Sequence, residues 1–347
     1  MIDFRYHLVS IVAVFLALAL GIVLGTTALN GPLVRGLKST ETTLKNQAAS
    51  LRSANDNKKQ RIAGDGLFAT AAAPQLLDGL LTGQQVVVVT APGADSGTVS
   101  GVTTAVQQAG GTVTGPVALN QQFFDTSATT ESSLTTLAQQ LAPPGVVVTA
   151  GSGQQADAPQ LAGQYEASSV LAAALVAKDG GTVTPAQTQS ILAGFAQQGY
   201  LQVSATSIAP ASLAVVISPA TPPQSGDGDP ANVTLISLTQ KLNAGGLGAV
   251  LDGSYPTGSG AGSAIDELTS GDTGIQVSSV DNAESEVGQI LTVQALAELM
   301  EGRKPTAYGV SAVPSPMPTP LPTVTPTPTS TGHPGKHHAR KTHKVNQ

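Results

Sequence analysis

Residues Leu8 to Leu29 read LVSIVAVFLALALGIVLGTTAL and contain no Asp, Glu, Lys or Arg. A helix that crosses the hydrocarbon core of a membrane needs about 20 mostly apolar residues. The run therefore predicts an N-terminal transmembrane anchor over residues 1–34. Gly21 and Gly25 lie four residues apart on one helix face, a spacing that lets two membrane helices approach closely, although such helices also tolerate glycine without pairing.

A cleavable signal peptide is the alternative reading of this run. Signal peptides have a shorter apolar core of about 7–15 residues and a small-residue cleavage site, a role that Thr26-Thr27-Ala28 could serve. The length of the run and the weakly basic start, with Asp3 beside Arg5, favour a retained signal anchor. Because long domains cross a membrane largely regardless of the flanking charges, we expect the rest of the chain to be extracytoplasmic.

Residues 35–62 predict a helical, coiled-coil stalk. Leu37, Leu44 and Leu51 recur every seven residues, and the alternate seam positions hold Thr40, Gln47 and Ala54. A seam that is only half apolar fits either a short two-stranded coiled coil or a single solvated helix. Because a membrane helix already gathers copies of the chain, we expect a homodimer formed through the transmembrane helix and the stalk.

Residues 63–309 predict one α/β domain with a mainly parallel sheet. Val86–Val89 is a continuous apolar run, typical of a strand buried on both faces, and such runs alternate with helical segments. Residues 63–73 are small and glycine-rich and predict a hinge, followed by a short helix from Pro74. The further expected strands are Thr112–Leu119, Val146–Val148, Leu213–Ile217, Ala249–Leu251 and Ile275–Val280; the expected helices are Ser96–Gln108, Leu134–Leu141, Ser168–Lys178, Pro185–Gln198, Ala231–Asn243 and Glu284–Glu301.

Residues 310–347 predict a disordered tail. Its first part, PSPMPTPLPTVTPTPTSTGHPG, has proline at every second or third position and cannot pack a core. The basic end carries the only histidine cluster of the chain, His333, His337, His338 and His343. Imidazole nitrogens bind Cu(II) and zinc, so these four residues are the candidate metal ligands. Contact of the basic tail with an anionic wall polymer or lipid is the alternative.

The charge pattern and the missing residue types exclude several functions. Residues 62–302 contain Lys178 and Lys241 as their only basic residues against nineteen acidic ones, which argues against nucleic acid as a partner. The chain has no cysteine, and none of its five histidines lies in the α/β domain. A Ser-His-Asp triad, a Cys-His pair and an imidazole metal site are therefore excluded there. We expect no enzyme and no bound cofactor.

Two loops could still hold ligands. Gly151-Ser-Gly153-Gln-Gln-Ala156 follows the expected strand at Val146–Thr149 and matches a relaxed dinucleotide-binding fingerprint. Pro159 interrupts the helix that should follow it, so a tight turn is the simpler interpretation and a nucleotide-binding enzyme a third hypothesis. Asp227-Gly-Asp229 could hold a hard cation, but two carboxylates are too few and favour a solvated turn.

Two blocks of the sequence resemble one known family. The opening MIDFRYHLVSIVAVFLALALGIVLGTT and the closing SVDNAESEVGQILTVQALAELMEGRKPTAYG, which runs to Tyr308-Gly309, are similar to the actinobacterial MctB family of copper transport proteins of the mycobacterial outer membrane. The likeness spans residues 1–309. It implies a cell-envelope protein of copper homeostasis that limits intracellular copper. A related corynebacterial branch, named SteB, implies the alternative of a cell-division scaffold that acts with a membrane partner of the SteA type.

The residues themselves limit how such a protein could handle copper. Soft Cu(I) sites use Cys or Met, and the chain has no Cys and only Met1, Met300 and Met317. Outer-membrane barrels need segments of about 10 residues that alternate apolar and polar side chains, whereas this domain has continuous apolar runs. We therefore expect neither a barrel formed by this chain alone nor tight copper binding by its α/β domain.

Overall fold

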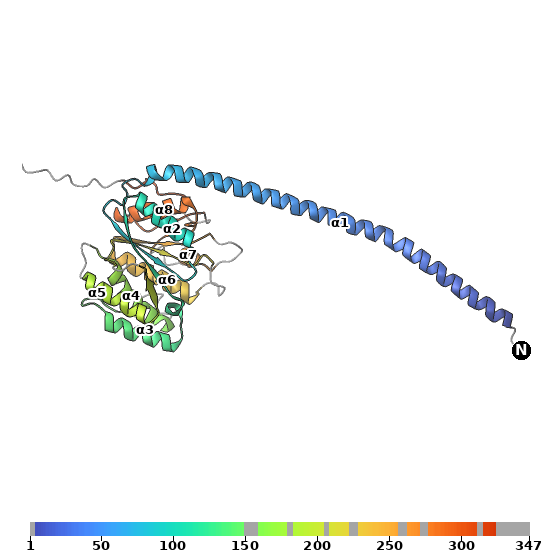
Figure 1. Cartoon of the computed structure of the whole chain (residues 1–347), viewed down its shortest axis with the longest axis horizontal. Helices are drawn as coiled ribbons and strands as arrows, with labels where there is room; N and C mark the ends of the chain where they lie inside the picture. Colours follow the sequence, from blue (N-terminus) through green and yellow to red (C-terminus); the bar gives the residue numbers. More distant parts are fainter. Residues whose placement is uncertain are drawn as a thin grey trace, which may run out of the picture. The chain divides into compact units, whose positions relative to one another are not determined.

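The computed structural model of the chain describes residues 4–148, 159–178, 183–204, 208–221, 228–255, 262–270, 277–310 and 315–323. These residues divide between Leu67 and Phe68 into two compact units. The first unit belongs entirely to helix α1, and the second contains the α/β domain (Figure 1).

Helix α1 (Phe4–Leu77) has the length and composition that a membrane anchor requires. Its segment Phe4–Gly25 has 22 residues and a mean hydropathy of 2.9, and none of it is buried. The stalk residues are helical as well, and Leu37, Leu44 and Leu51 are 70%, 59% and 72% exposed. No other described part of the chain packs against these leucines. Their exposure leaves them available to a second copy of the chain, and the dimer stays a prediction.

The hinge expected at residues 63–73 is wrong, because helix α1 runs through this segment to Leu77. Ala69, Ala73 and Leu77 recur every four residues on one helix face and are buried in the α/β domain. Alanine is the best helix former, and each interior glycine costs only about 1 kcal/mol. Packing of this face in the domain outweighs the flexibility that the small residues suggested.

The second unit contains one seven-stranded sheet with the order β3-β2-β1-β4-β5-β6-β7. All neighbours pair in parallel except β2 and β3, which are antiparallel. The mainly parallel α/β fold is therefore confirmed. The strands are β1 (Gln85–Thr90), β2 (Thr112–Leu119), β3 (Leu201–Val203), β4 (Leu213–Ile217), β5 (Gly248–Asp252), β6 (Ser278–Val280) and β7 (Ala307–Tyr308).

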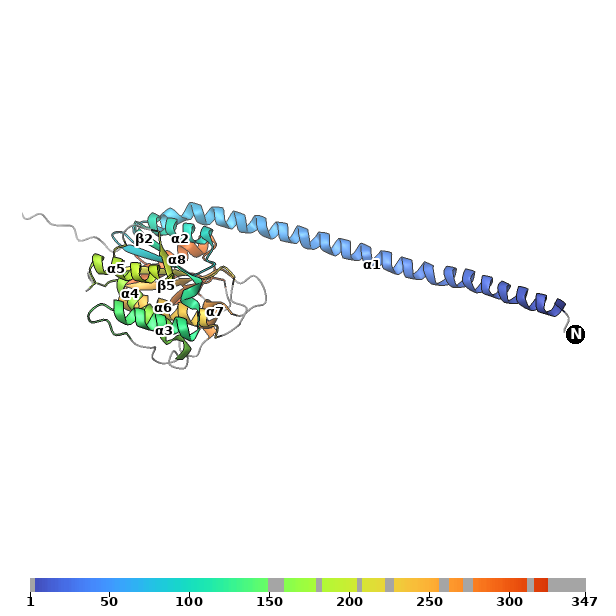
Figure 2. The same cartoon turned by 60° about the horizontal axis from the view of Figure 1, so that its bottom comes forward.

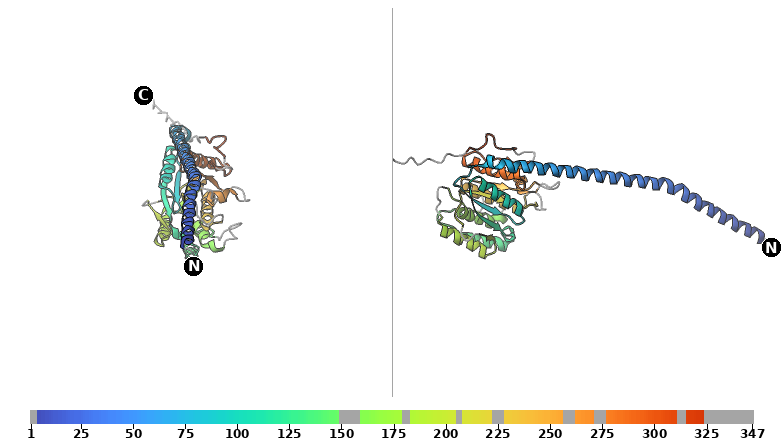
Figure 3. Two further views of the ribbon diagram at one scale, coloured as in Figure 1. Left: turned by 90° about the vertical axis from the view of Figure 1, so that its right-hand side faces the viewer. Right: turned by 45° about the horizontal axis from the view of Figure 1, so that its top comes forward.

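Helices cover both faces of the sheet (Figures 2 and 3). The end of α1, α2 (Ser96–Gln108) and α8 (Glu286–Met300) share one apolar cluster with Val86 and Val88. Val87 and Val89 point into the other cluster, beneath the remaining helices. Those are α3 (Ala128–Leu141), α4 (Ala162–Leu175), α5 (Pro185–Gln197), α6 (Pro230–Gly245) and α7 (Ala264–Ser270), with 3-10 turns at η1 (Gln121–Phe124) and η3 (Pro159–Leu161).

The connections place a topological switch point between β1 and β4. The chain steps from β1 to β2 with α2 on one face, and from β4 to β5 in the opposite direction with α6 on the other face. These two connections therefore have the same hand. The β6–α8–β7 connection runs along the sheet in the same direction as β4–α6–β5, but α8 lies on the face that α2 covers. Its hand is therefore opposite to that of the other two connections, which is rare in parallel sheets.

Two further expectations differ from the structure. Val146–Val148 is not a strand, and Val147 is 74% exposed; three valines alone do not fix a strand when the sheet offers them no buried place. The proposed fingerprint at 151–156 lies outside the described residues. Residues 315–323 of the expected disordered tail pack on the domain: Ser315 N–H donates to the Ala307 carbonyl at 2.8 Å.

Candidate functional site

The loops after β1 and β4 meet at the switch point. Ala91 N–H donates to the Ile217 carbonyl at 2.9 Å, and Ala220 N–H donates to the Gly93 carbonyl at 3.0 Å. Gly93 has a φ of +82°, a left-handed conformation that glycine adopts without steric cost. The two loops are thus tied together at the carboxyl edge of the sheet, where open α/β folds bind their ligands.

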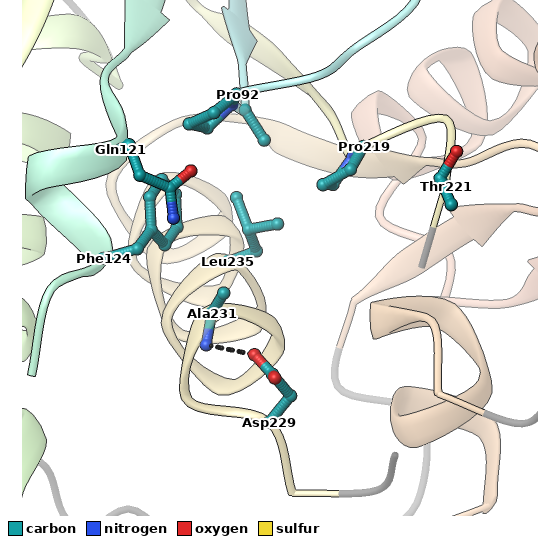
Figure 4. Close-up of a pocket in the computed structure, with 9 residues that line it drawn as sticks. Pro92, Gln121, Phe124, Pro219, Thr221, Asp229, Ala231 and Leu235 are labelled. Carbon is teal, nitrogen blue, oxygen red and sulfur yellow. Dashed lines mark hydrogen bonds between the residues drawn. The ribbon is translucent and has the colours of Figure 1, made fainter. Parts of the chain in front are cut away.

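A cavity of about 280 Å³ opens beside these loops (Figure 4). Its wall is mainly apolar, because β1 and β4 are each followed two residues later by a proline, and η1 and α6 add an aromatic and an aliphatic side chain. The apolar contributors are Ala91, Pro92, Phe124, Pro219, Ala231 and Leu235. Ligand pockets are usually apolar cavities with a few polar groups that fix the orientation of the ligand, and this cavity has that composition.

The polar groups of the cavity are Gln121, Thr221 and Asp229. Asp229 is the N-cap of α6, and its carboxylate accepts the Ala231 N–H at 2.8 Å. It is only 8% exposed. The acidic loop of the sequence thus supplies a helix cap, which satisfies an N–H group that the first helical turn leaves without a partner; Asp227 lies outside the described residues.

The described residues that line the cavity include no His, Cys, Lys or Arg, and their polar groups are an amide, a hydroxyl and a carboxylate. The sequence pointed to this place only indirectly, through two apolar runs that are each followed by a proline. Our sequence interpretation missed it because neighbouring strands in the sheet are far apart in the chain.

A second polar group lies at the end of β5, where Asp252 is fully buried. The Thr292 hydroxyl of α8 lies 2.9 Å and 3.0 Å from its two carboxylate oxygens. Burial raises the pKa of Asp252 well above its usual range, and the Thr292 hydrogen bond opposes that shift. The sequence signal that could have identified Asp252 is its position as an acidic residue directly after the apolar run Ala249–Leu251. Because Asp252 is fully buried, we assign it a structural role and not a role in ligand binding.

The closing block of the sequence holds the edge at β6 and β7 together. Asp281 follows β6, and its carboxylate accepts the Val310 N–H at 2.8 Å. Gly309 has a φ of +131°, and any side chain there would collide with the Asp281 carboxylate. The preceding Tyr308 is buried, and its hydroxyl donates to Glu298 of α8. The Tyr-Gly pair is therefore explained by one buried hydrogen bond and one position without space for a side chain.

Residues 315–323, here called the proline segment, bind at the end of α8. Arg303 Nη1 donates to the Pro320 carbonyl at 2.6 Å and to Glu298 Oε1 at 2.9 Å. The Thr323 N–H donates to Glu301 Oε1 at 2.7 Å. The Pro320 carbonyl and the Thr323 N–H are thus held by charged side chains of the domain, and the Ser315 N–H by the Ala307 carbonyl, which explains why a proline-rich sequence is fixed here.

The candidate copper ligands are not brought together in the described part of the chain. His333, His337, His338 and His343 lie outside it. Within it, no group of three or more His, Cys, Asp or Glu side chains could hold a metal ion. Met300 packs against the apolar cluster around α2 and α8, and Met317 is 45% exposed in the proline segment. The metal site predicted from the tail therefore stays a prediction.

Together these features define a class: a chain whose described residues include one helix of membrane-spanning length and an open α/β domain with a crevice at its switch point. The chain belongs to the MctB family, described as copper transport outer membrane protein, which matches residues 1–318. It is 27% identical over 310 residues to the copper transporter MctB of Mycobacterium tuberculosis (strain ATCC 25618 / H37Rv), over 89% of this chain and 96% of the relative. The copper transporter MctB of Mycobacterium leprae (strain TN) is 29% identical over 316 residues, with the same coverage.

These findings confirm the family that the two sequence blocks suggested. The match extends from the anchor helix through the α/β domain and into the proline segment. Neither relative is named for cell division, so the alternative of an envelope scaffold with a SteA-type partner gains no support.

Proposed function

We propose that this chain serves copper homeostasis in the cell envelope, where it limits intracellular copper. The observation that carries the proposal is membership of the copper transport family across residues 1–318. Two relatives that match over 96% of their own length are named copper transporters. Copper is the cargo in this proposal, not a resident cofactor, and the chain performs no catalysis.

The α/β domain does not supply the copper ligands in this proposal. Its carboxylates prefer hard cations, and Cu(I) prefers sulfur. The His residues of the tail take that role, with His337 and His338 adjacent to each other and His333 and His343 four and five residues away. A chain segment with several imidazoles can capture Cu(II) without a preformed pocket.

The transmembrane anchor determines on which side of the membrane the chain handles copper in this proposal. The apolar helix spans one membrane once, residues 35–347 lie outside the cytoplasm, and two copies pair through the transmembrane helix and the stalk. The support for this topology is the segment Phe4–Gly25, which is long and apolar enough to cross a membrane, together with the outer membrane in the description of the family.

The test compares a strain that lacks this gene with the same strain carrying the gene again. We expect the deletion to accumulate copper, measured by mass spectrometry of washed cells, and to stop growing at a lower copper concentration. Return of the wild-type gene should restore both. Normal copper content together with defective septation in the deletion strain would contradict the proposal.

A chain with all four tail histidines replaced by alanine separates the two parts of the proposal. Failure of this variant to restore copper tolerance, at normal abundance, supports the tail as the copper-binding part. Full restoration would assign the ligands elsewhere while leaving the copper function intact.

A further inference from the structure

We propose that the cavity at the switch point is a binding site for a small organic cation, such as an amine that carries an apolar group. This inference does not depend on the copper function. It is based on the wall of the cavity, on the charge of the one buried polar group in that wall, and on the distribution of basic residues in the domain.

The wall selects a ligand with an apolar face. Pro92 and Pro219 lie on one side of the cavity, with Phe124 and Leu235 between them and the α6 N-terminus (Figure 4). A volume of about 280 Å³ is slightly below the range of typical small-molecule pockets, about 300–1,000 Å³. The size fits a single ring or a short branched chain and is too small for a nucleotide.

Charge then selects a cation. Asp229 is 8% exposed and lines the cavity. One of its oxygens accepts the Ala231 N–H; within the described chain, no hydrogen bond is found for the other. A carboxylate that is largely removed from water gains more from a cationic partner than an exposed one does, because the local dielectric constant is lower.

An anionic ligand finds no basic side chain among the described residues that line the cavity. The basic residues in the described part of the α/β domain are Lys178, Lys241, Arg303 and Lys304, and none of them lines the cavity. The N-terminus of α6 would attract an anion through its dipole, but the Asp229 carboxylate already occupies that position as the helix cap. Phosphate and carboxylate ligands would therefore meet a like charge.

Gln121 supplies a second hydrogen-bonding group. Its side-chain amide comes from η1 and points toward the middle of the ring of labelled residues (Figure 4). The amide oxygen can accept a second N–H of an ammonium group, while Asp229 takes the first. Two acceptors at different sides of an apolar cavity would fix the orientation of an amine.

The absence of cysteine from the chain allows a direct test. Ala231→Cys places a single thiol on the wall of the cavity in the purified full-length chain. The thiolate attacks a methanethiosulfonate reagent, a mixed disulfide forms and methanesulfinate leaves. We compare the trimethylammonioethyl reagent with the sulfonatoethyl reagent. Ser190→Cys, on the exposed face of α5, is the matched control.

A cleft lined by one sign of charge raises the local concentration of opposite ions by about tenfold or more. We therefore expect the ratio of cationic to anionic rates at Ala231→Cys to exceed the ratio at Ser190→Cys by about tenfold. Benzylammonium should slow the modification of Ala231→Cys, and benzoate should not. Asn at position 229 keeps a good helix cap. Combining Asp229→Asn with Ala231→Cys should therefore remove both the preference for the cationic reagent and the protection by benzylammonium.

Equal rate ratios at the two positions, or protection by benzoate as strong as by benzylammonium, would overturn the proposal. Thr221→Cys, on the exposed rim of the same cavity, gives a second thiol in case the helix does not tolerate a change at Ala231. The Thr221→Cys thiol should also prefer the cationic reagent more strongly than the control thiol does. A lack of this preference at Thr221→Cys would count equally against the proposal.

Discussion

The Thr292 hydroxyl of α8 lies within hydrogen-bond distance of both carboxylate oxygens of Asp252, at 2.9 Å and 3.0 Å. The same hydroxyl lies 3.1 Å from the Gly288 carbonyl. A hydroxyl has one proton, so it can donate to only one of these acceptors at a time. When Asp252 is protonated, it can donate to Thr292, which is then free to donate to Gly288, and all three groups are satisfied.

Asp252→Asn should stabilise the fold at neutral pH. Burial raises the pKa of Asp252 well above its usual range, so the folded chain holds this proton to a higher pH than the unfolded chain does. Between the ordinary value of about 4 and the raised value, the unfolded state binds fewer protons, and the free energy of unfolding falls as pH rises. Asparagine stays neutral and removes this fall, by about 1.4 kcal/mol for each unit of pKa shift.

Denaturant unfolding between pH 4 and pH 8 measures this effect. The same change at an exposed helix cap, Asp95→Asn, is the control, and it should give no gain of stability at neutral pH. A loss of stability in Asp252→Asn that is the same at both ends of the pH range would show that the carboxyl group is held ionised.

Tyr308→Phe should destabilise the closing edge of the domain. The Tyr308 hydroxyl donates to Glu298, a carboxylate that is only 7% exposed. Hydrogen bonds to charged groups contribute about 1.5–3 kcal/mol, so the free energy of unfolding should drop by about that amount. Tyr255→Phe is the matched control, because Tyr255 is 48% exposed. Equal stability of the two variants would mean that Arg303 alone satisfies Glu298.

Arg303→Ala should release the proline segment. Arg303 links Glu298 to the Pro320 carbonyl, and without it the hydrogen bonds found between the described segment and the domain are those of Ser315 and Thr323, at its two ends. Hydrogen exchange at the Thr323 amide, which donates to Glu301, should accelerate by at least tenfold. The neighbouring Lys304→Ala, with an exposed side chain, should leave that exchange rate unchanged; unchanged exchange in Arg303→Ala as well would place the anchor at the two ends of the segment.

The order of strands and helices could be predicted because burial on both faces leaves a continuous apolar signal. Leu213–Ile217 and Ser96–Gln108 have the same bounds in the sequence interpretation and in the structure. The two-residue β7 carries no such signal, since only its partner β6 makes it a strand. Composition alone predicted a hinge at residues 63–73 and disorder at residues 315–323. In both segments, contacts with distant parts of the chain determine the structure instead.

The crevice could be predicted only in part. The proline after each of two apolar runs marks a loop, but the order of strands that brings Pro92 next to Pro219 is a property of the whole sheet. The role of Asp229 as a helix cap follows from its place before Pro230 and a helical segment. The interpretation of this loop as a solvated turn did not use that local signal.

The stalk should hold two copies of the chain together. Leu44 and Leu51 are exposed in the single chain, and each contributes about 1.5–3 kcal/mol when fully covered. The combined change Leu44→Asp and Leu51→Asp should therefore make a 35–347 fragment monomeric by light scattering. The control changes Thr42→Asp and Ala49→Asp add the same charge at positions away from the seam and should leave a dimer. A wild-type fragment that is already monomeric would move the pairing to the transmembrane helix.

Copper binding should require the tail histidines and should depend on pH. Residues 62–309 contain no Cys, no His and one Met, Met300, whose side chain packs in the domain. We expect calorimetric titration of Cu(II) into the full-length chain to show binding at pH 7.5. Replacement of His333, His337, His338 and His343 by alanine should abolish it. Imidazole must be neutral to bind a metal, so the affinity should fall as pH drops below about 6.5, the usual histidine pKa.

The control for this titration replaces Lys336, Arg340 and Lys341 by glutamine, which keeps every imidazole and removes basic charge from the same segment. Its Cu(II) affinity should equal or exceed that of the wild type, since fewer positive charges surround the metal. Tight stoichiometric copper on the chain without tail histidines would place the ligands among the carboxylates of the α/β domain. Loss of binding in the control alone would show that the basic side chains of the tail, rather than its imidazoles, determine copper capture.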